Sequence, residues 1–147
     1  MIRKAAVPRK KTDEGKDACW DAIRTLEKTK PMQPLLWADL LVMPSREFVQ
    51  DAGNKGIVSH IGSEGSSVME RLERYGKGQG ANPRENNCYG VNDDSFDVVI
   101  RMLIDDGSPE RANRSNLLNP TLKMTAIQSG PHSQYHYMVN QFFIATD

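Results

Sequence analysis

Apolar residues recur at a helical spacing near the start of the chain. Trp20, Ile23 and Leu26 follow one another every three residues, and the pattern begins at about Asp17. Pro31 ends it, because a proline cannot donate the backbone hydrogen bond that would continue a helix. The first predicted element is therefore a helix that begins near position 17 and ends before the proline.

Two further helices are predicted before the middle of the chain. A helical pattern extends over 37–53, and Pro44 within it predicts either a kink or a new start behind Ser45. In 67–75 (SVMERLERY) Ser67 is followed three positions later by Glu70, the arrangement of a capping box. We expect this helix to begin at the serine.

The period of the pattern changes toward the C-terminus. After a short CYGV segment, a helix is predicted over 95–104 and a helical turn from Pro109. Residues 121–128 (TLKMTAIQ) alternate apolar and polar side chains, and 137–146 (YMVNQFFIAT) are rich in strand-forming residues. These two segments are predicted to pair as antiparallel strands, so the fold class is α+β, with helices packed on an antiparallel sheet.

Composition narrows the classes of partner and the compartment. The 147 residues suit one domain, and 19 basic residues balance 19 acidic ones, which argues against nucleic acid as a partner. Cys19 and Cys88 fit no metal spacing and are too few for a disulfide framework, so we expect reduced thiols and an intracellular location, cytoplasmic or cytoskeletal. Secretion stays open if the chain is a processed form. No apolar run is long enough to span a bilayer.

The first 16 residues differ from the rest. They carry six Lys or Arg and almost no large apolar side chain, so they cannot offset the entropy of ordering on their own. We interpret 1–16 as a basic tail ahead of a domain over 17–147. The tail is expected to become ordered along an acidic groove of a protein partner.

Several stretches in a fixed order suggest a known family. They are PLLWADLL, GIVSHIGSEGSSVMERLERYG, ENNCYG, VVIRMLIDDGSPERANRSNLLNP, the IQSGPH turn and a final aromatic strand. Over about 18–145 the chain resembles the CAP superfamily of cysteine-rich secretory proteins, antigen 5 and pathogenesis-related (SCP-like) proteins, in its cysteine-poor branch. The resemblance implies an α–β–α sandwich with a central antiparallel sheet.

The same resemblance implies a cleft in which two histidines and two acidic residues hold a divalent metal, usually zinc. By position, His60 resembles the first histidine, Glu85 the glutamate of the Gly-Glu-Asn motif and Asp105, within a residue or so, the second carboxylate. Asn113 stands where family members often have the second histidine, and an amide is a poor zinc ligand. Arg84 adds a cation that would compete with a metal. We therefore expect no metal, no cofactor and no catalytic residue, and a hydrogen bond from His60 to Glu85 or Asn113.

The other histidine, acidic, serine and aromatic residues are expected to have structural roles and no catalytic one. His132 and His136 are expected to be loop and surface histidines, and the Asp105–Asp106 pair to end a helix. The serines around His60 do not form a nucleophile elbow. The larger aromatic residues would line a lipid groove if the family's lipid binding applies, but we favour core positions for them. They are Trp20, Trp37, Phe48 and Tyr75.

Three functions follow as hypotheses. The favoured one is a non-catalytic CAP domain that acts as a structural or interaction module in an intracellular assembly, with other proteins as partners contacted through the tail. The second is a lipid- or membrane-surface-binding protein that uses the basic tail as an electrostatic contact. The third is a metal-dependent hydrolase, against which Asn113 argues.

Overall fold

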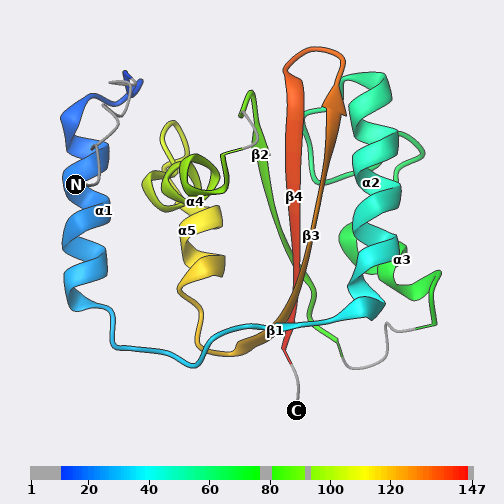
Figure 1. Ribbon diagram of the computed structural model, residues 1–147, viewed down its shortest axis with the longest axis horizontal. Coiled ribbons are helices and arrows are strands. Elements are labelled where there is room, and N and C mark those ends of the chain that lie inside the picture. The colour runs from blue at the N-terminus through cyan, green and yellow to red at the C-terminus, as the bar shows by residue number, and fades with distance from the viewer. Residues whose placement is uncertain (1–10, 77–80, 92–93, 146–147) are drawn as a thin grey trace, which may run out of the picture.

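The structure is a computed structural model that describes residues 11–76, 81–91 and 94–145. A four-stranded sheet forms the middle layer, with α2 and α3 on one face and α1, α4 and α5 on the other (Figure 1). The elements, in chain order, are α1 (Lys16–Lys28), β1 (Leu36–Trp37), the 3-10 turn η1 (Asp39–Leu41), α2 (Val42–Lys55), α3 (Val68–Glu73), β2 (Arg84–Tyr89), α4 (Ser95–Ile104), α5 (Ala112–Leu117), β3 (Leu122–His132) and β4 (His136–Ala145).

The sheet is mixed, whereas the sequence predicted an antiparallel one. Its strand order is β1-β3-β4-β2, and the β3–β4 and β4–β2 pairs are antiparallel as expected. The short β1 pairs parallel to β3, with Leu36 opposite Met124. The two residues of β1 lie in the connection between α1 and α2, and they were too few to show a strand period.

The C-terminal hairpin corrects the prediction for His132. This residue is 2% exposed and lies at the end of β3, where its Nδ1 accepts from the backbone N–H groups of Gln134 and Tyr135 at 3.3 and 3.2 Å. Its Nε2 lies 3.1 Å from the carbonyl oxygen of Ile57. The imidazole therefore ties the hairpin to the end of α2. His136, across the turn, is exposed as predicted.

Two helices begin later than predicted, and one begins where expected. α2 starts at Val42 and not at Trp37, so Pro44 falls in its first turn, where its missing N–H costs nothing. α5 starts at Ala112, three residues after Pro109. The capping box of α3 is confirmed: Ser67 accepts from the backbone of Glu70, whose side chain accepts from the backbone of Ser67.

The aromatic residues do not all lie in the core. Phe48 is 1% exposed and packs with its α2 neighbours against β4, but Trp20 and Trp37 are each 55% exposed and Tyr75 is 37% exposed. For these last three, the predicted core position is wrong. A helical spacing shows which residues share a face, but not whether another element covers it.

The end of the predicted tail contacts the domain. Glu14 binds Arg111, with the carboxylate 2.5 Å from Nη1, and accepts the backbone N–H of Gly107 at 2.7 Å. The backbone of Asp13 donates to Asp106 at 2.7 Å. Residues 1–10 lie outside the described part of the chain. The segment just before α1 is therefore attached to the α4–α5 turn of its own domain.

Candidate functional site

The loop that carries His60 is fastened to α2. Asp51 accepts the backbone N–H of Ser63 at 2.7 Å and its hydroxyl at 2.6 Å, and it also pairs with Lys55 at 2.8 Å. Burial raises the pKa of the Asp51 carboxyl, but hydrogen bonds from Lys55 and Ser63 outweigh this and lower the pKa to about 2. At Gly62 a Cβ would lie 2.6 Å from the Ser66 hydroxyl, so a larger residue would displace the Ser66 side chain from this turn. The glycine–serine stretch thus fixes the position of His60.

Glu85 is the centre of the polar network on β2. Its carboxylate is buried, and Oε1 lies 2.9 Å from His60 Nδ1 and 3.0 Å from the amide nitrogen of Asn87. Oε2 accepts from Arg71 Nη2 at 2.5 Å. The expected hydrogen bond of His60 is therefore present, and its partner is Glu85. Both carboxylate oxygens are engaged by protein groups.

Arg71 is the functional-site residue that the sequence did not reveal. It lies on α3 with its side chain 1% exposed, 4.1 Å above the ring of Phe48. Its Nη1 donates to the carbonyls of His60 and Ser66 at 3.1 and 3.0 Å, while its Nε is buried without a hydrogen-bond partner. No local signal separates Arg71 from Arg74, whose side chain is 44% exposed.

The cation beside Glu85 is therefore Arg71 and not Arg84. Successive residues of a strand point to opposite faces, and in β2 Arg84 is exposed while Glu85 is buried. The sequence correctly suggested that a cation satisfies this carboxylate. It assigned that role to the wrong arginine, because adjacency in a strand separates side chains.

Asp105 and Asn113 form a second pair. Asp105 is the C-cap of α4, in the left-handed conformation (φ 51°), and it is 5% exposed. Its Oδ2 accepts the backbone N–H groups of Asn113 and Arg114 at 2.8 and 3.2 Å, and its Oδ1 accepts the Asn113 amide at 2.9 Å. Asp105 thus caps the N-terminus of α5, which has no capping side chain of its own.

The two pairs are linked through neighbouring amides. Asn86 donates to the carbonyl of Asn113 at 3.0 Å, and Asn116 donates to the carbonyl of Glu85 at 3.3 Å, so α5 is held against β2. Within the described residues, no group of three or more His, Cys, Asp or Glu side chains is arranged to hold a metal ion. With one imidazole bonded to Glu85 and both carboxylates engaged, the residues present do not fit a zinc site.

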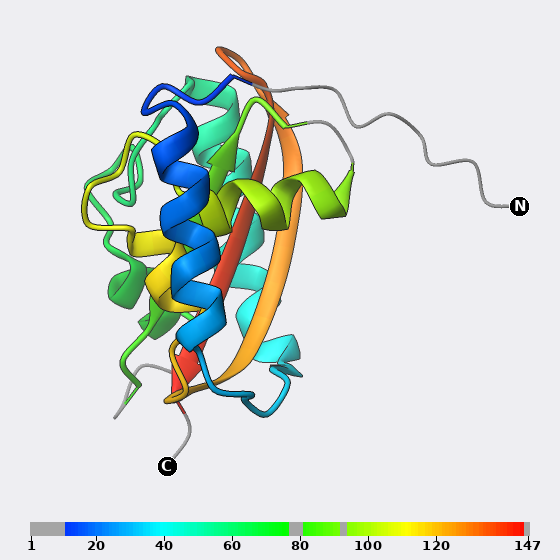
Figure 2. The same ribbon diagram turned by 90° about the vertical axis from the view of Figure 1, so that its left-hand side faces the viewer.

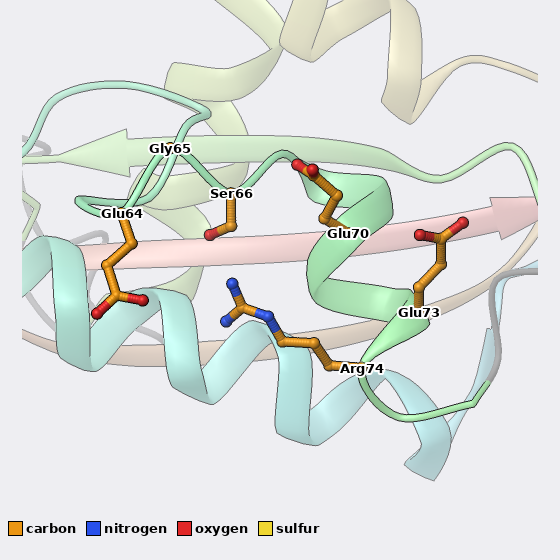
Figure 3. Close-up of a pocket in the computed structure, with 6 residues that line it drawn as sticks. All are labelled: Glu64, Gly65, Ser66, Glu70, Glu73 and Arg74. Atoms are coloured by element: carbon orange, nitrogen blue, oxygen red, sulfur yellow. The ribbon is translucent and has the colours of Figure 1, made fainter.

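A hollow of about 340 Å³ lies beside α3. Figure 3 shows the side chains of Glu64, Glu70, Glu73 and Arg74 around it. Glu70 is engaged in the capping box, and Arg74 forms an ion pair with Glu47. None of the four residues singled out by position lines this hollow.

Two findings concern the cysteines and the membrane. Cys19 lies on α1 and Cys88 on β2, and no disulfide joins them. Among the helices of the described segments, none is both long and apolar enough to cross a bilayer.

The layered α+β fold, with its long C-terminal hairpin, is CAP-like (SCP-like). No family model and no curated protein matches the sequence. Among solved structures, the chain is similar to an outer surface protein from Borrelia burgdorferi, with a TM-score of 0.65 and 20% identity, over 94% of this chain and 98% of that one. It is also similar to an extracellular protein containing a SCP domain from Bacillus anthracis str. Ames, with a TM-score of 0.62 and 22% identity, over 84% of this chain and 37% of that one. At these identities the likeness concerns the fold alone.

Proposed function

We propose that this chain is a non-catalytic CAP-fold domain that acts as a structural or interaction module in an intracellular protein assembly. The observation that carries the proposal is the buried Arg71–Glu85 ion pair. A carboxylate that acts as a metal ligand or a general base needs a free lone pair directed at the reacting group. Here both oxygens of Glu85 are held by protein donors.

Asp105 supports the same conclusion. Its carboxylate accepts two backbone N–H groups at the start of α5, so it serves the fold. Glu85 and Asp105 thus both act as structural acceptors. What the domain leaves exposed is instead apolar surface on α1, where Trp20, Ile23 and Leu26 are 41–55% exposed.

One experiment tests the non-catalytic part. Zinc-supplemented protein is assayed against ester and peptide substrates beside a His60→Ala variant, whose imidazole is 54% exposed and whose loss leaves the Arg71–Glu85 pair in place. We expect no turnover that depends on His60. Turnover that is lost in the variant contradicts the proposal and favours the hydrolase.

A second experiment tests the interaction part. Full-length chain and a chain without residues 1–10 are used to capture partners at about 50 and 300 mM salt, since exposed ion pairs are screened by salt. The deletion ends at position 10 because Asp13 and Glu14, a few residues further on, contact the domain. We expect a defined partner that is retained by the full chain and lost on truncation or at high salt. Equal capture of the partner by both chains would show that the tail does not bind it.

A lipid surface is the second candidate, favoured by the combination of Trp20, Ile23 and Leu26 with the basic residues of α1. Co-sedimentation with anionic vesicles tests it. Vesicle binding that is lost when the apolar residues of α1 are replaced supports the lipid function in place of the protein partner.

A further inference from the structure

One margin of the central sheet is open over most of its length. β3 pairs with β4 along Leu122–His132, but β1 covers its other side only at Met124 and Thr125. In Figure 2 β3, drawn in orange, forms the margin of the sheet beside β4, drawn in red. Among the described strands, none lies along the outer side of β3 after Thr125. We name the space beside 127–131 the β3 lane.

The backbone of β3 directs hydrogen-bonding groups into the β3 lane at every second residue. The carbonyl of Thr125 accepts the N–H of Ala38 at 2.9 Å, so the N–H and C=O of Thr125 both face away from β4. The pairing of β3 with β4 continues without a shift along the rest of the strand. The N–H and C=O groups of Ile127 and Ser129 therefore face the lane as well.

The β3 lane is bounded at both ends. The carbonyl of Ala38, which would continue the ladder to Ile127, accepts the N–H of Leu41 instead, because the chain turns there into η1 and α2. At the other end, Pro131 has no N–H, and its carbonyl oxygen lies where a Cβ added to Gly53 of α2 would be 2.2 Å away. The space between these ends suits about five extended residues, or roughly 16 Å of strand.

A groove of about 280 Å³ lies between β3 and α2. On the helix side it is lined by Arg46, Gln50 and Asn54, which follow one another at intervals of four residues and therefore share one side of α2. All three are exposed. A strand in the β3 lane would turn every second side chain toward α2, because side chains alternate between the two faces of a sheet. These side chains would meet the polar stripe of the helix.

The charge of the groove favours an acidic side chain. Among the described residues, no ion pair involves Arg46. The two acidic residues beside it on α2 are already engaged, Glu47 with Arg74 and Asp51 with Lys55. A carboxylate placed here would find a guanidinium without a charged partner, and guanidinium–carboxylate hydrogen bonds are among the stronger ones.

In the free domain the open edge is shielded by its own side chains. The Nε2 of Gln128 donates to the carbonyl of Ile127 at 2.7 Å, and the Nε of Arg46 donates to the Oε1 of Gln128 at 3.4 Å. Exposed edges are commonly protected in this way or by a proline against unwanted pairing. An added strand would take over the Ile127 carbonyl and leave Arg46 free to bind a carboxylate.

We propose that the β3 lane binds a short extended peptide segment of a partner protein, which pairs with Ile127 and Ser129 and directs an acidic side chain to Arg46. The proposal rests on the interaction role of the proposed function and names the chemistry of the partner. Addition of a strand to an open sheet edge is a general mode of peptide recognition. A second copy of this chain fits less well, because its own long β3, paired antiparallel across Ile127 and Ser129, would extend into the space of β1.

The probe is a peptide selected on the full chain from a phage-displayed library of random heptapeptides. We expect the enriched sequences to contain Asp or Glu, and a labelled synthetic copy to bind in a fluorescence polarisation assay. N-methylation of this peptide should weaken binding at least about tenfold at every second residue and be tolerated in between, because only alternate N–H groups of an added strand face β3.

Two protein variants test the same contacts. Ser129→Pro removes an N–H that faces the lane and should weaken peptide binding at least about tenfold. Its matched control is Ser129→Ala: both variants lose the 2.9 Å hydrogen bond between the Ser129 hydroxyl and Tyr137, but alanine keeps the N–H. Arg46→Gln should weaken binding about two- to fivefold and reduce its dependence on salt. Circular dichroism verifies folding, and if Ser129→Pro is unfolded, the N-methylated peptides on the unchanged chain decide.

Three outcomes overturn the proposal. The first is that no peptide is enriched, or that the selected peptide binds Ser129→Pro as tightly as Ser129→Ala. The second is a loss on N-methylation that does not alternate, which would place the binding on side chains. The third is a dimer of the full chain that Ser129→Pro abolishes, which would assign the edge to a second copy. If the peptide fails but partner capture through the tail persists, the proposed function stands without the β3 lane.

Discussion

Replacing Arg71 by methionine should be among the most damaging single changes in this domain. The substitution keeps an unbranched side chain over Phe48 but removes the charge that faces Glu85, and both partners of that ion pair have side chains 1% exposed. Breaking a buried pair by removing one partner costs about 3–5 kcal/mol, because the other charge is left uncompensated. The carbonyls of His60 and Ser66 also lose their donor.

We therefore expect a loss of about 4 kcal/mol in the free energy of unfolding. In a domain of this length that corresponds to a decrease in melting temperature of roughly 8–16 °C. Urea denaturation followed by circular dichroism measures the first quantity and calorimetry the second. The matched control is Arg74→Met, on the same helix, whose partner Glu47 is partly exposed and whose loss should cost less than about 1 kcal/mol.

A double-mutant cycle keeps the prediction testable if the variant is barely folded. Glu85→Gln retains the shape of the side chain without its charge, so Arg71→Met combined with Glu85→Gln should be more stable than Arg71→Met alone by about 2 kcal/mol. If Arg71→Met costs no more than Arg74→Met, or if the second substitution adds a further independent loss, the buried pair does not stabilise the domain in this way.

The remaining predictions concern zinc and acid. Asn113→His adds a nitrogen donor but leaves Glu85 bound to Arg71. Titration calorimetry should therefore show a marked rise in zinc affinity only when Arg71→Met is combined with Asn113→His. A strong gain from Asn113→His alone would show that Glu85 is available to the metal. The hydrogen bond from Arg111 and that from a backbone N–H lower the pKa of Glu14 to about 2. Because the folded-state pKa lies below the unfolded value, the stabilisation is complete above about pH 4.5 and is lost as the pH falls toward 2. The melting temperatures of the unchanged chain and Glu14→Gln should therefore differ at pH 7 and converge near pH 2; a constant difference would contradict this account.

Much of the fold could be predicted because its signals are local. The capping box at Ser67 specifies the start of α3 through two neighbouring backbone groups, and the alternation over 121–128 specifies a half-buried strand. The bond between His60 and Glu85 followed from the family resemblance and not from any local pattern. The parallel pairing of β1 was missed, because a two-residue strand has no measurable period.

The sequence by itself determined most of the helices, the two strands of the C-terminal hairpin and which side chains share a face, since these properties depend on neighbours within one or two turns. Only the tertiary structure decided what each face and each charge meets. Arg71 and Arg74 are three residues apart with the same chemistry, yet one is buried against Glu85 and the other lies at the surface, because α3 presents only one side to β2 and α2. For the same reason Trp20 begins an apolar stripe that the sequence placed in the core and the fold turned outward: which side of a helix is covered depends on elements that are remote in the chain.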